Sequence, residues 1–250
     1  MPARLLGLDH GPESLTLVRH GESVGNLADA EAHRTHAQRL DLEERDADVP
    51  LSDLGRDQAR AVADHLAGLA DDAAPTLVVS SPYRRALETA TTALGDADRV
   101  VLDERLRERD LGQLDGLTGA GIRHEFASEA RRRAKVGKFY YQPPGGESWA
   151  DVVLRVRSLL GDLRHGFEGE RVWLFTHQAV IMSFRYVLEG VTEAELLHID
   201  KEVPVPNCSI TTYRHSPDGP VLERFGATDH LEGRETTVTR EAAGSERQLS

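Results

Sequence analysis

Short apolar runs alternate along the chain with longer segments in which apolar residues recur every three or four positions. The runs are rich in strand-forming residues and lie at residues 15–18, 76–80, 99–102 and 171–176. Each run is shorter than a typical helix and is bounded by polar residues, which favours buried strands. The alternation of strands and helices predicts an α/β protein in which helices are layered on a sheet.

Three of the longer segments carry helix signals. One helix is expected to begin at Ser52, with Gly55 as a local weakness, and another at Ser148, where an aspartate three residues later completes a capping box. A third is expected over residues 178–188, closed by Gly190. The first two helices present apolar faces formed by Ala59, Val62, Ala63, Leu66 and Leu69, and by Val152, Val156, Leu159, Leu160 and Leu163.

Chemically active side chains follow the four apolar runs. Arg19 and His20 come directly after the first run, and Arg85 lies in the first helical turn after the second. Glu108 lies in a loop beyond the third run, and His177 comes directly after the fourth. In α/β sheets ligands bind beyond the carboxyl ends of the strands, so these side chains are expected to meet in one site.

Five linked motifs accompany these residues. They read Arg-His-Gly-Glu-Ser-x-x-Asn from Arg19, Ser-Pro-x-x-Arg-Ala-x-x-Thr-Ala from Ser81, Leu-x-Glu-x-x-x-Gly-x-x-x-Gly from Leu106, Pro-Gly-Gly-Glu-Ser from Pro144, and the late strand with its histidine. Over residues 15–213 the chain thereby resembles the histidine phosphatase superfamily, which includes cofactor-dependent phosphoglycerate mutases and many acid phosphatases. The resemblance implies a phosphoglycerate mutase-like fold, three-layer α/β/α with a central, mostly parallel sheet.

Phosphoryl transfer needs a nucleophile, positive donors for the phosphoryl oxygens and a proton for the leaving group. His20 is the candidate nucleophile, since neutral imidazole is available near pH 7, and it would form a phosphohistidine that water hydrolyses. Arg19 and Arg85 offer forked donors, and His177 would add another, most effectively when protonated. Glu108 is the candidate general acid, which requires its carboxyl to keep a proton.

Further polar residues are candidates for phosphate or substrate contacts. They are Ser23, Asn26 and Gln178, the last of which, with Ala179, stands where the family commonly has two glycines after the second histidine. The run Arg131-Arg132-Arg133, with Lys135 and Lys138, is either a solvated helix face or a source of positive charge over the site.

Two of these assignments also have a purely structural interpretation. His177 could be a structural histidine, and Glu108 could form a surface ion pair with a flanking arginine. A metal site at His33 and His36 is weakly supported, because no set of further ligands accompanies them. The matching of several motifs favours the catalytic interpretation, and no metal is expected.

Three functions remain open. The preferred one is a phosphatase that hydrolyses phosphate monoesters of small molecules, and residues 139–148 favour this branch. The second is a phosphoglycerate mutase primed by 2,3-bisphosphoglycerate, and the third is a non-catalytic protein that binds a phosphorylated ligand. No cofactor is expected, apart from 2,3-bisphosphoglycerate if the protein is a mutase.

Composition limits the partners. The 250 residues carry a formal net charge of −12, which argues against a nucleic-acid or anionic membrane surface. No run approaches the ~18 consecutive apolar residues of a membrane span, so a cytoplasmic enzyme is expected. Cys208 is the only cysteine, which excludes an intramolecular disulfide. A homodimer is left open.

The domain organisation is expected to be simple. Residues 1–230 are predicted to form a single domain with inserted loops around 28–50 and 117–146. A turn at residues 216–220 joins two late strands into an antiparallel sheet edge. Residues 231–250 are polar and without period, so they are expected to form a loose tail.

Overall fold

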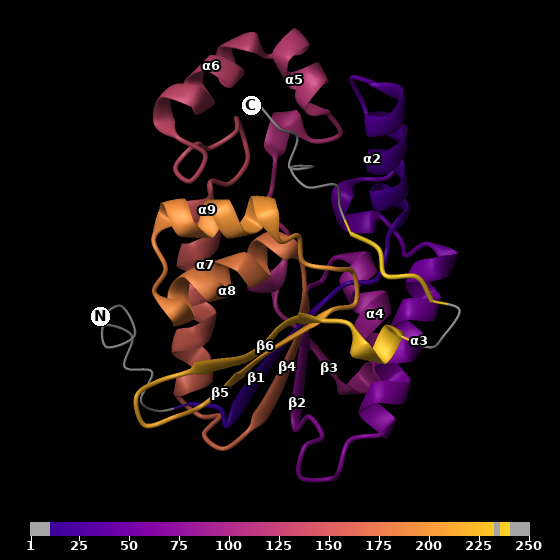
Figure 1. Ribbon diagram of the computed structural model, residues 1–250, viewed down its shortest axis with the longest axis vertical. Helices are drawn as coiled ribbons and strands as arrows, with labels where there is room; N and C mark the ends of the chain where they lie inside the picture. Colours follow the sequence, from indigo (N-terminus) through magenta and orange to yellow (C-terminus); the bar gives the residue numbers. More distant parts are fainter. Residues whose placement is uncertain (1–10, 233–235, 241–250) are drawn as a thin grey trace.

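The computed structural model describes residues 11–232 and 236–240, which form a six-stranded sheet of order β3-β2-β4-β1-β5-β6 (Figure 1). Its strands are β1 (Ser14–Arg19), β2 (Leu77–Ser80), β3 (Val100–Leu102), β4 (Arg171–Thr176), β5 (Ile210–Arg214) and β6 (Val221–Ala227). The strands β1 to β4 pair in parallel, whereas β5 is antiparallel to both β1 and β6. The mostly parallel sheet and its antiparallel edge are confirmed.

Helices cover both faces of this sheet (Figure 1). One face carries α7 (Trp149–Arg164), α8 (Gln178–Glu189) and α9 (Glu193–Glu202), and the other carries α3 (Asp53–Ala67) and α4 (Arg84–Leu94). Strand side chains alternate between the two cores. Leu17 and Leu174 pack with α7 and α8, whereas Val18 and Phe175 pack with α3 and α4. The three-layer α/β/α architecture is confirmed.

Two insertions meet beside the sheet, at the top of Figure 1. They contain α2 (Val24–Thr35), α5 (Gly119–Glu125) and α6 (Ala127–Val136). The amide of Leu40 donates to the carbonyl of Gly116 at 2.9 Å, and the amide of Thr118 donates to that of Gln38 at 3.0 Å. Backbone pairing therefore joins the two insertions into one unit, which we call the cap (residues 24–50 and 112–146).

The described part of the chain also contains short 3₁₀ helices. They are η1 (Asp46–Asp48), η2 (Ala97–Arg99), η3 (Glu104–Leu106), η4 (Gly112–Leu114) and η5 (Asp229–Leu231). Among residues 11–232 and 236–240, none of the helices is long and apolar enough to cross a membrane.

Residues 236–240, which fall within the expected tail, lie against the body of the protein and form hydrogen bonds with it. The hydroxyl of Thr239 donates to Oδ1 of Asn207 at 3.1 Å, and Nε2 of Gln58 donates to the carbonyl of Thr237 at 2.9 Å. Both amide side chains are buried and need partners, which this polar segment supplies. Residues 233–235 and 241–250 of the expected tail lie outside the described residues.

Gly55 is required by a close backbone approach. The helix α3 begins as expected, with the Ser52 hydroxyl accepting the Gly55 amide at 2.9 Å. A Cβ atom at Gly55 would lie 1.9 Å from the carbonyl oxygen of Glu22, which belongs to the loop that follows β1. The small residue that weakens the helix locally therefore lets α3 pack against the His20 loop.

We expect Gly55→Ala to lower the free energy of unfolding by roughly 1–3 kcal/mol, because the added methyl group overpacks this contact. Gly161→Ala in α7 is the matched control, since a Cβ atom there meets nothing within 4 Å. In Gly161→Ala the free energy of unfolding should rise by about 0.5–1 kcal/mol, because alanine favours the helix more than glycine does. Denaturant titration of both variants checks the prediction, and equal stabilisation would contradict it.

Candidate active site

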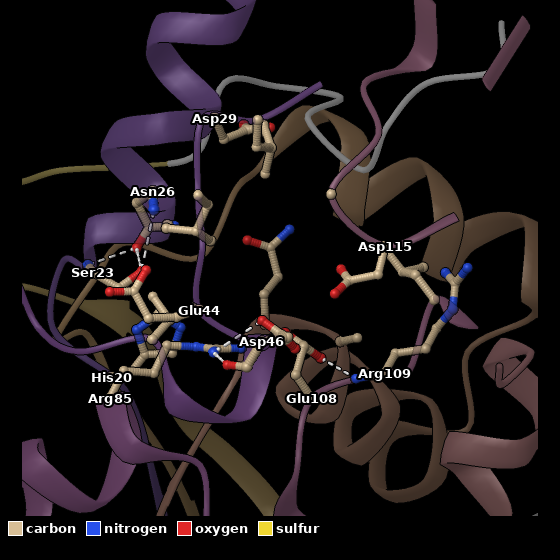
Figure 2. Close-up of a pocket in the computed structure, with 18 of the residues that line it drawn as sticks. His20, Ser23, Asn26, Asp29, Glu44, Asp46, Arg85, Glu108, Arg109 and Asp115 are labelled. Carbon is tan, nitrogen blue, oxygen red and sulfur yellow. Dashed lines mark hydrogen bonds and ion pairs between the residues drawn. The ribbon is translucent and has the colours of Figure 1, made fainter. Parts of the chain in front are cut away.

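The predicted site residues converge around one cavity of about 460 Å³. Its wall includes His20, which follows β1, Arg85 in the first turn of α4, and Glu108, which follows η3 (Figure 2). Arg19 and His177 are fully buried at the ends of β1 and β4 and do not belong to the cavity wall. The strand ends thus bring the residues together as the sequence predicts.

His20 is held in the tautomer that a nucleophile needs. Its Nδ1 lies 2.7 Å from the carbonyl oxygen of Gly21. Because a carbonyl only accepts, Nδ1 carries the proton and Nε2 keeps its lone pair. Burial lowers the pKa of His20 well below 6.5, and the charges of Arg85 and Arg19 lower it further. The imidazole is therefore neutral near pH 7.

His177 lies beside it, with the two ring centroids 5.1 Å apart. Its Nε2 lies 2.8 Å from the Ser81 hydroxyl, which already accepts the Tyr83 amide at 3.2 Å. The hydroxyl proton is thus available to Nε2, which leaves the ring proton on Nδ1. That atom is buried without a hydrogen-bond partner in the described part of the chain. Neutral His177 can therefore donate to a phosphoryl oxygen from Nδ1.

The pKa of His177 is also lowered well below 6.5, first by burial and then by the charge of Arg85. The expected protonated form of His177 is therefore not the form favoured by the site without ligand. A bound phosphate dianion would raise the pKa of His177, since a nearby negative charge favours a protonated imidazole.

The two buried histidines are expected to make stability depend on pH. Their pKa values are lowered in the folded protein, so the unfolded chain binds protons that the folded one does not. The free energy of unfolding should fall as the pH drops below about 6.5, by up to ~1.4 kcal/mol per pH unit for each histidine. Denaturant midpoints between pH 7 and 5 measure this slope. The double variant His20→Ala/His177→Ala should have a shallower slope, and an unchanged slope would contradict the assignment.

Arg85 is held by the cap. Its Nη1 donates to the carbonyl oxygen of Asp46 at 2.6 Å and lies 3.0 Å from the Asp46 carboxylate (Figure 2). Its guanidinium also lies over the ring of Tyr83, 5.2 Å from the centroid. Sequence reasoning missed Asp46, because it is one acidic residue among several in a highly charged segment and no spacing marks it.

Glu108 lines the cavity, and its Oε1 accepts the amide of Arg109 at 2.8 Å. The guanidinium of Arg107 binds the carboxylate of Glu147 at 2.6 Å. Of the two arginines that flank Glu108, Arg107 therefore pairs with Glu147.

Glu147 is a second residue whose part sequence reasoning missed. Its carboxylate binds Arg107 and Arg155 and accepts the amide of Asp110 at 3.1 Å. Arg155 also donates to the carbonyl of Glu108 at 3.3 Å. Glu147 and Arg155 thus anchor the loop that carries Glu108. The Pro-Gly-Gly-Glu-Ser motif was the available signal.

Ser23 and Asn26 also line the cavity, but their described hydrogen bonds order the loop. They form a capping box at the start of α2, and Nδ2 of Asn207 donates to Oδ1 of Asn26 at 3.4 Å and to the carbonyl of His20 at 3.2 Å. Gln178 lines the cavity too, and its Nε2 donates to Asp200 at 3.1 Å. Substrate contacts by these residues stay predictions.

The basic run does not reach the cavity. Arg131, Arg132 and Lys135 are exposed on α6, and none of residues 131–138 belongs to the cavity wall. Arg131, Arg132 and Lys135 therefore form a solvated helix face, whereas Lys138 lies beyond α6 and binds Asp200 at 3.0 Å. In the described residues no group of three or more His, Cys, Asp or Glu side chains is arranged to hold a metal ion.

Fold and site together define an α/β protein with a histidine-centred pocket suited to phosphate esters. The chain belongs to the histidine phosphatase superfamily (branch 1), whose family model matches residues 15–228.

Similar proteins include phosphatases and a mutase. The chain is 38% identical over 151 residues to a glucosyl-3-phosphoglycerate phosphatase of Mycolicibacterium vanbaalenii, covering 60% of this chain and 59% of the relative. It is 29% identical over 217 residues to a 2,3-bisphosphoglycerate-dependent phosphoglycerate mutase of Gloeobacter violaceus, covering 82% and 87%. The structure of a mycobacterial glucosyl-3-phosphoglycerate phosphatase matches with a TM-score of 0.67 and 28% identity, over 86% of this chain and 99% of that one.

Some relatives are longer proteins. Relatives from Mycobacterium bovis and Mycobacterium tuberculosis, 34% identical over 207 residues, match 80% of this chain, which spans about half (48%) of their length.

Proposed function

We propose that the protein is a phosphatase that hydrolyses phosphate monoesters of small molecules through a phosphohistidine on His20. The observation that carries the proposal is the hydrogen bond from Nδ1 of His20 to Gly21, because it directs the Nε2 lone pair to be the nucleophile. Neutral imidazole beside buried arginine charges combines nucleophilicity with attraction for the phosphoryl group.

The reaction runs in two displacements. Nε2 of His20 attacks phosphorus, the bond to the ester oxygen breaks, and Glu108 gives its proton to the departing alkoxide. Arg19, Arg85 and His177 stabilise the negative charge on the phosphoryl oxygens. Glu108, now ionised, takes a proton from water, which attacks phosphorus and frees His20 and inorganic phosphate. No cofactor is needed in these steps.

A phosphoglycerate mutase is the second candidate, and the similarity to the Gloeobacter violaceus mutase is the observation that favours it. A mutase would use the same phosphohistidine but would return the phosphoryl group to the bound glycerate before water reaches it. It would need priming by 2,3-bisphosphoglycerate.

One incubation separates the two functions. Purified protein with 3-phosphoglycerate and a trace of 2,3-bisphosphoglycerate is followed for inorganic phosphate and 2-phosphoglycerate together, beside a panel of other monoesters. We expect phosphate release from several esters without isomerisation. Rapid isomerisation with little free phosphate would make the protein a mutase, and no turnover at all would favour a non-catalytic ligand binder.

Asp46→Asn is expected to strengthen competitive inhibition by inorganic phosphate roughly three- to tenfold, because the Asp46 carboxylate competes with phosphate for Arg85 in a partly exposed ion pair. Asp48→Asn is the matched control, since Asp48 lies in the same segment and binds Arg45 instead. Inhibition constants of both variants test this. Weaker phosphate inhibition in Asp46→Asn would instead make Asp46 a residue that orients Arg85 for the ligand.

A cytoplasmic location, the lack of a nucleic-acid partner and a homodimer remain predictions.

A further inference from the structure

We propose that the cavity selects phosphate monoesters whose organic part is polyhydroxylated and carries no second anionic group. The inference rests on the proposed phosphatase function and concerns the part of the cavity beyond His20. Three observations carry it: the charge of the cavity wall, an unsatisfied acceptor in that wall, and the size and construction of the cavity.

The wall carries more negative than positive side chains among the described residues. Apart from Glu108, whose carboxyl holds the proton for the leaving group, its carboxylates belong to Asp29, Glu44, Asp46 and Asp115, and its guanidiniums to Arg39, Arg85 and Arg109. Arg85 is paired with Asp46, and Arg39 donates to both carboxylate oxygens of Glu125, at 3.2 and 2.5 Å. A second carboxylate or phosphate on the substrate would therefore meet repulsion, which water screens poorly inside a cavity.

The acidic side chains are distributed around the cavity. In Figure 2, Asp46 lies against Arg85, whereas Asp29 and Asp115 lie on other sides of the cavity, and Asp115 points toward the centre. The phosphoryl group can be held next to His20 by Arg19 and Arg85. The rest of the substrate extends toward Asp115, where carboxylate oxygens can accept hydrogen bonds from hydroxyl groups.

Gln178 supplies a further acceptor. Its Nε2 donates to Oδ1 of Asp200, and Asp200 also binds Nζ of Lys138 at 3.0 Å. Because a carboxylate accepts only, the amide is oriented with Oε1 away from Asp200. That Oε1 is buried and has no hydrogen-bond partner in the described part of the chain, although Gln178 belongs to the cavity wall. A substrate hydroxyl would satisfy it, whereas a second anion offers no proton.

The cavity is suited in size to a sugar-like body. Its volume of about 460 Å³ is well above what a phosphoryl group needs and lies within the usual range for small-molecule sites. Leu40, Leu42 and Leu111 give the wall apolar patches that can pack against C–H groups. Backbone pairing of Leu40 with Gly116 holds the two insertions together, so this wall is largely preformed.

Matched ester pairs test the proposal. Sorbitol 6-phosphate and 6-phosphogluconate differ only in an alcohol or a carboxylate at C1, and so do sn-glycerol 1-phosphate and D-3-phosphoglycerate. We expect kcat/KM to be at least tenfold higher for the alcohol in each pair. Raising the salt concentration should narrow the ratio, because it screens the repulsion.

Asp115→Asn identifies the responsible charge. We expect Asp115→Asn to lower the ratio of kcat/KM for the alcohol to kcat/KM for the carboxylate at least threefold. Asp48→Asn should leave this ratio unchanged, because the Asp48 carboxylate binds Arg45 and does not line the cavity. A preference for the carboxylates in the wild-type protein would overturn the proposal, and so would an Asp115→Asn ratio equal to the wild-type ratio. Failure to hydrolyse any ester, 4-nitrophenyl phosphate included, would instead overturn the proposed phosphatase function.

Discussion

Replacement of His20 by alanine is expected to lower kcat for every phosphate monoester by roughly 10⁴-fold or more, because no other group can form the covalent intermediate. The neighbouring imidazole cannot substitute for it. Nε2 of His177 is engaged with the Ser81 hydroxyl and Nδ1 carries the ring proton, so neither nitrogen offers a free lone pair to phosphorus. Phosphate-ester binding should remain measurable in His20→Ala, since Arg19 and Arg85 are unchanged.

Trapping the intermediate makes this result specific to a nucleophile. Rapid quenching of the wild-type protein with a phosphorus-labelled ester, at alkaline pH where phosphohistidine survives, should leave label on the protein. The label should be absent in His20→Ala and still form, more slowly, in His177→Ala. Label in His20→Ala, or full turnover by that variant, would refute the covalent mechanism.

The sequence was most informative where chemistry and local structure coincide. The strands β1, β2 and β4 are apolar runs that each end in a polar residue, so the positions of His20 and His177 directly after β1 and β4 could be predicted. The capping box of Ser148 and the closing Gly190 followed from local rules in the same way.

Contacts between distant segments could not be predicted. The pairing of Asp46 with Arg85 spans 39 positions, and the binding of Thr239 to Asn207 spans 32. Such contacts depend on how loops pack on the finished sheet, and their residue types are common in any charged loop. Gly55 illustrates the same limit, since its helix propensity pointed to a weakness whereas its close contact with Glu22 is tertiary.

Glu108→Gln is expected to lower kcat/KM for alkyl phosphates by roughly 10²–10⁴-fold, because the isosteric amide cannot give a proton to the departing alkoxide. With 4-nitrophenyl phosphate the loss should be less than about tenfold, since 4-nitrophenolate is a stable anion that leaves without protonation. The loop should stay in place in this variant, because Glu147 and Arg155 anchor it through other atoms.

The contrast between the two leaving groups separates proton donation from other roles. If Glu108 only shaped the cavity, its replacement would slow both esters equally. Glu104→Gln is the control, since Glu104 is exposed on η3 four residues earlier and does not line the cavity. It should leave both rates near the wild-type values. Equal losses on both esters in Glu108→Gln would remove Glu108 from the acid role and direct the search for the proton donor to the remaining carboxyl groups of the cavity wall, with Asp46 and Asp115 first.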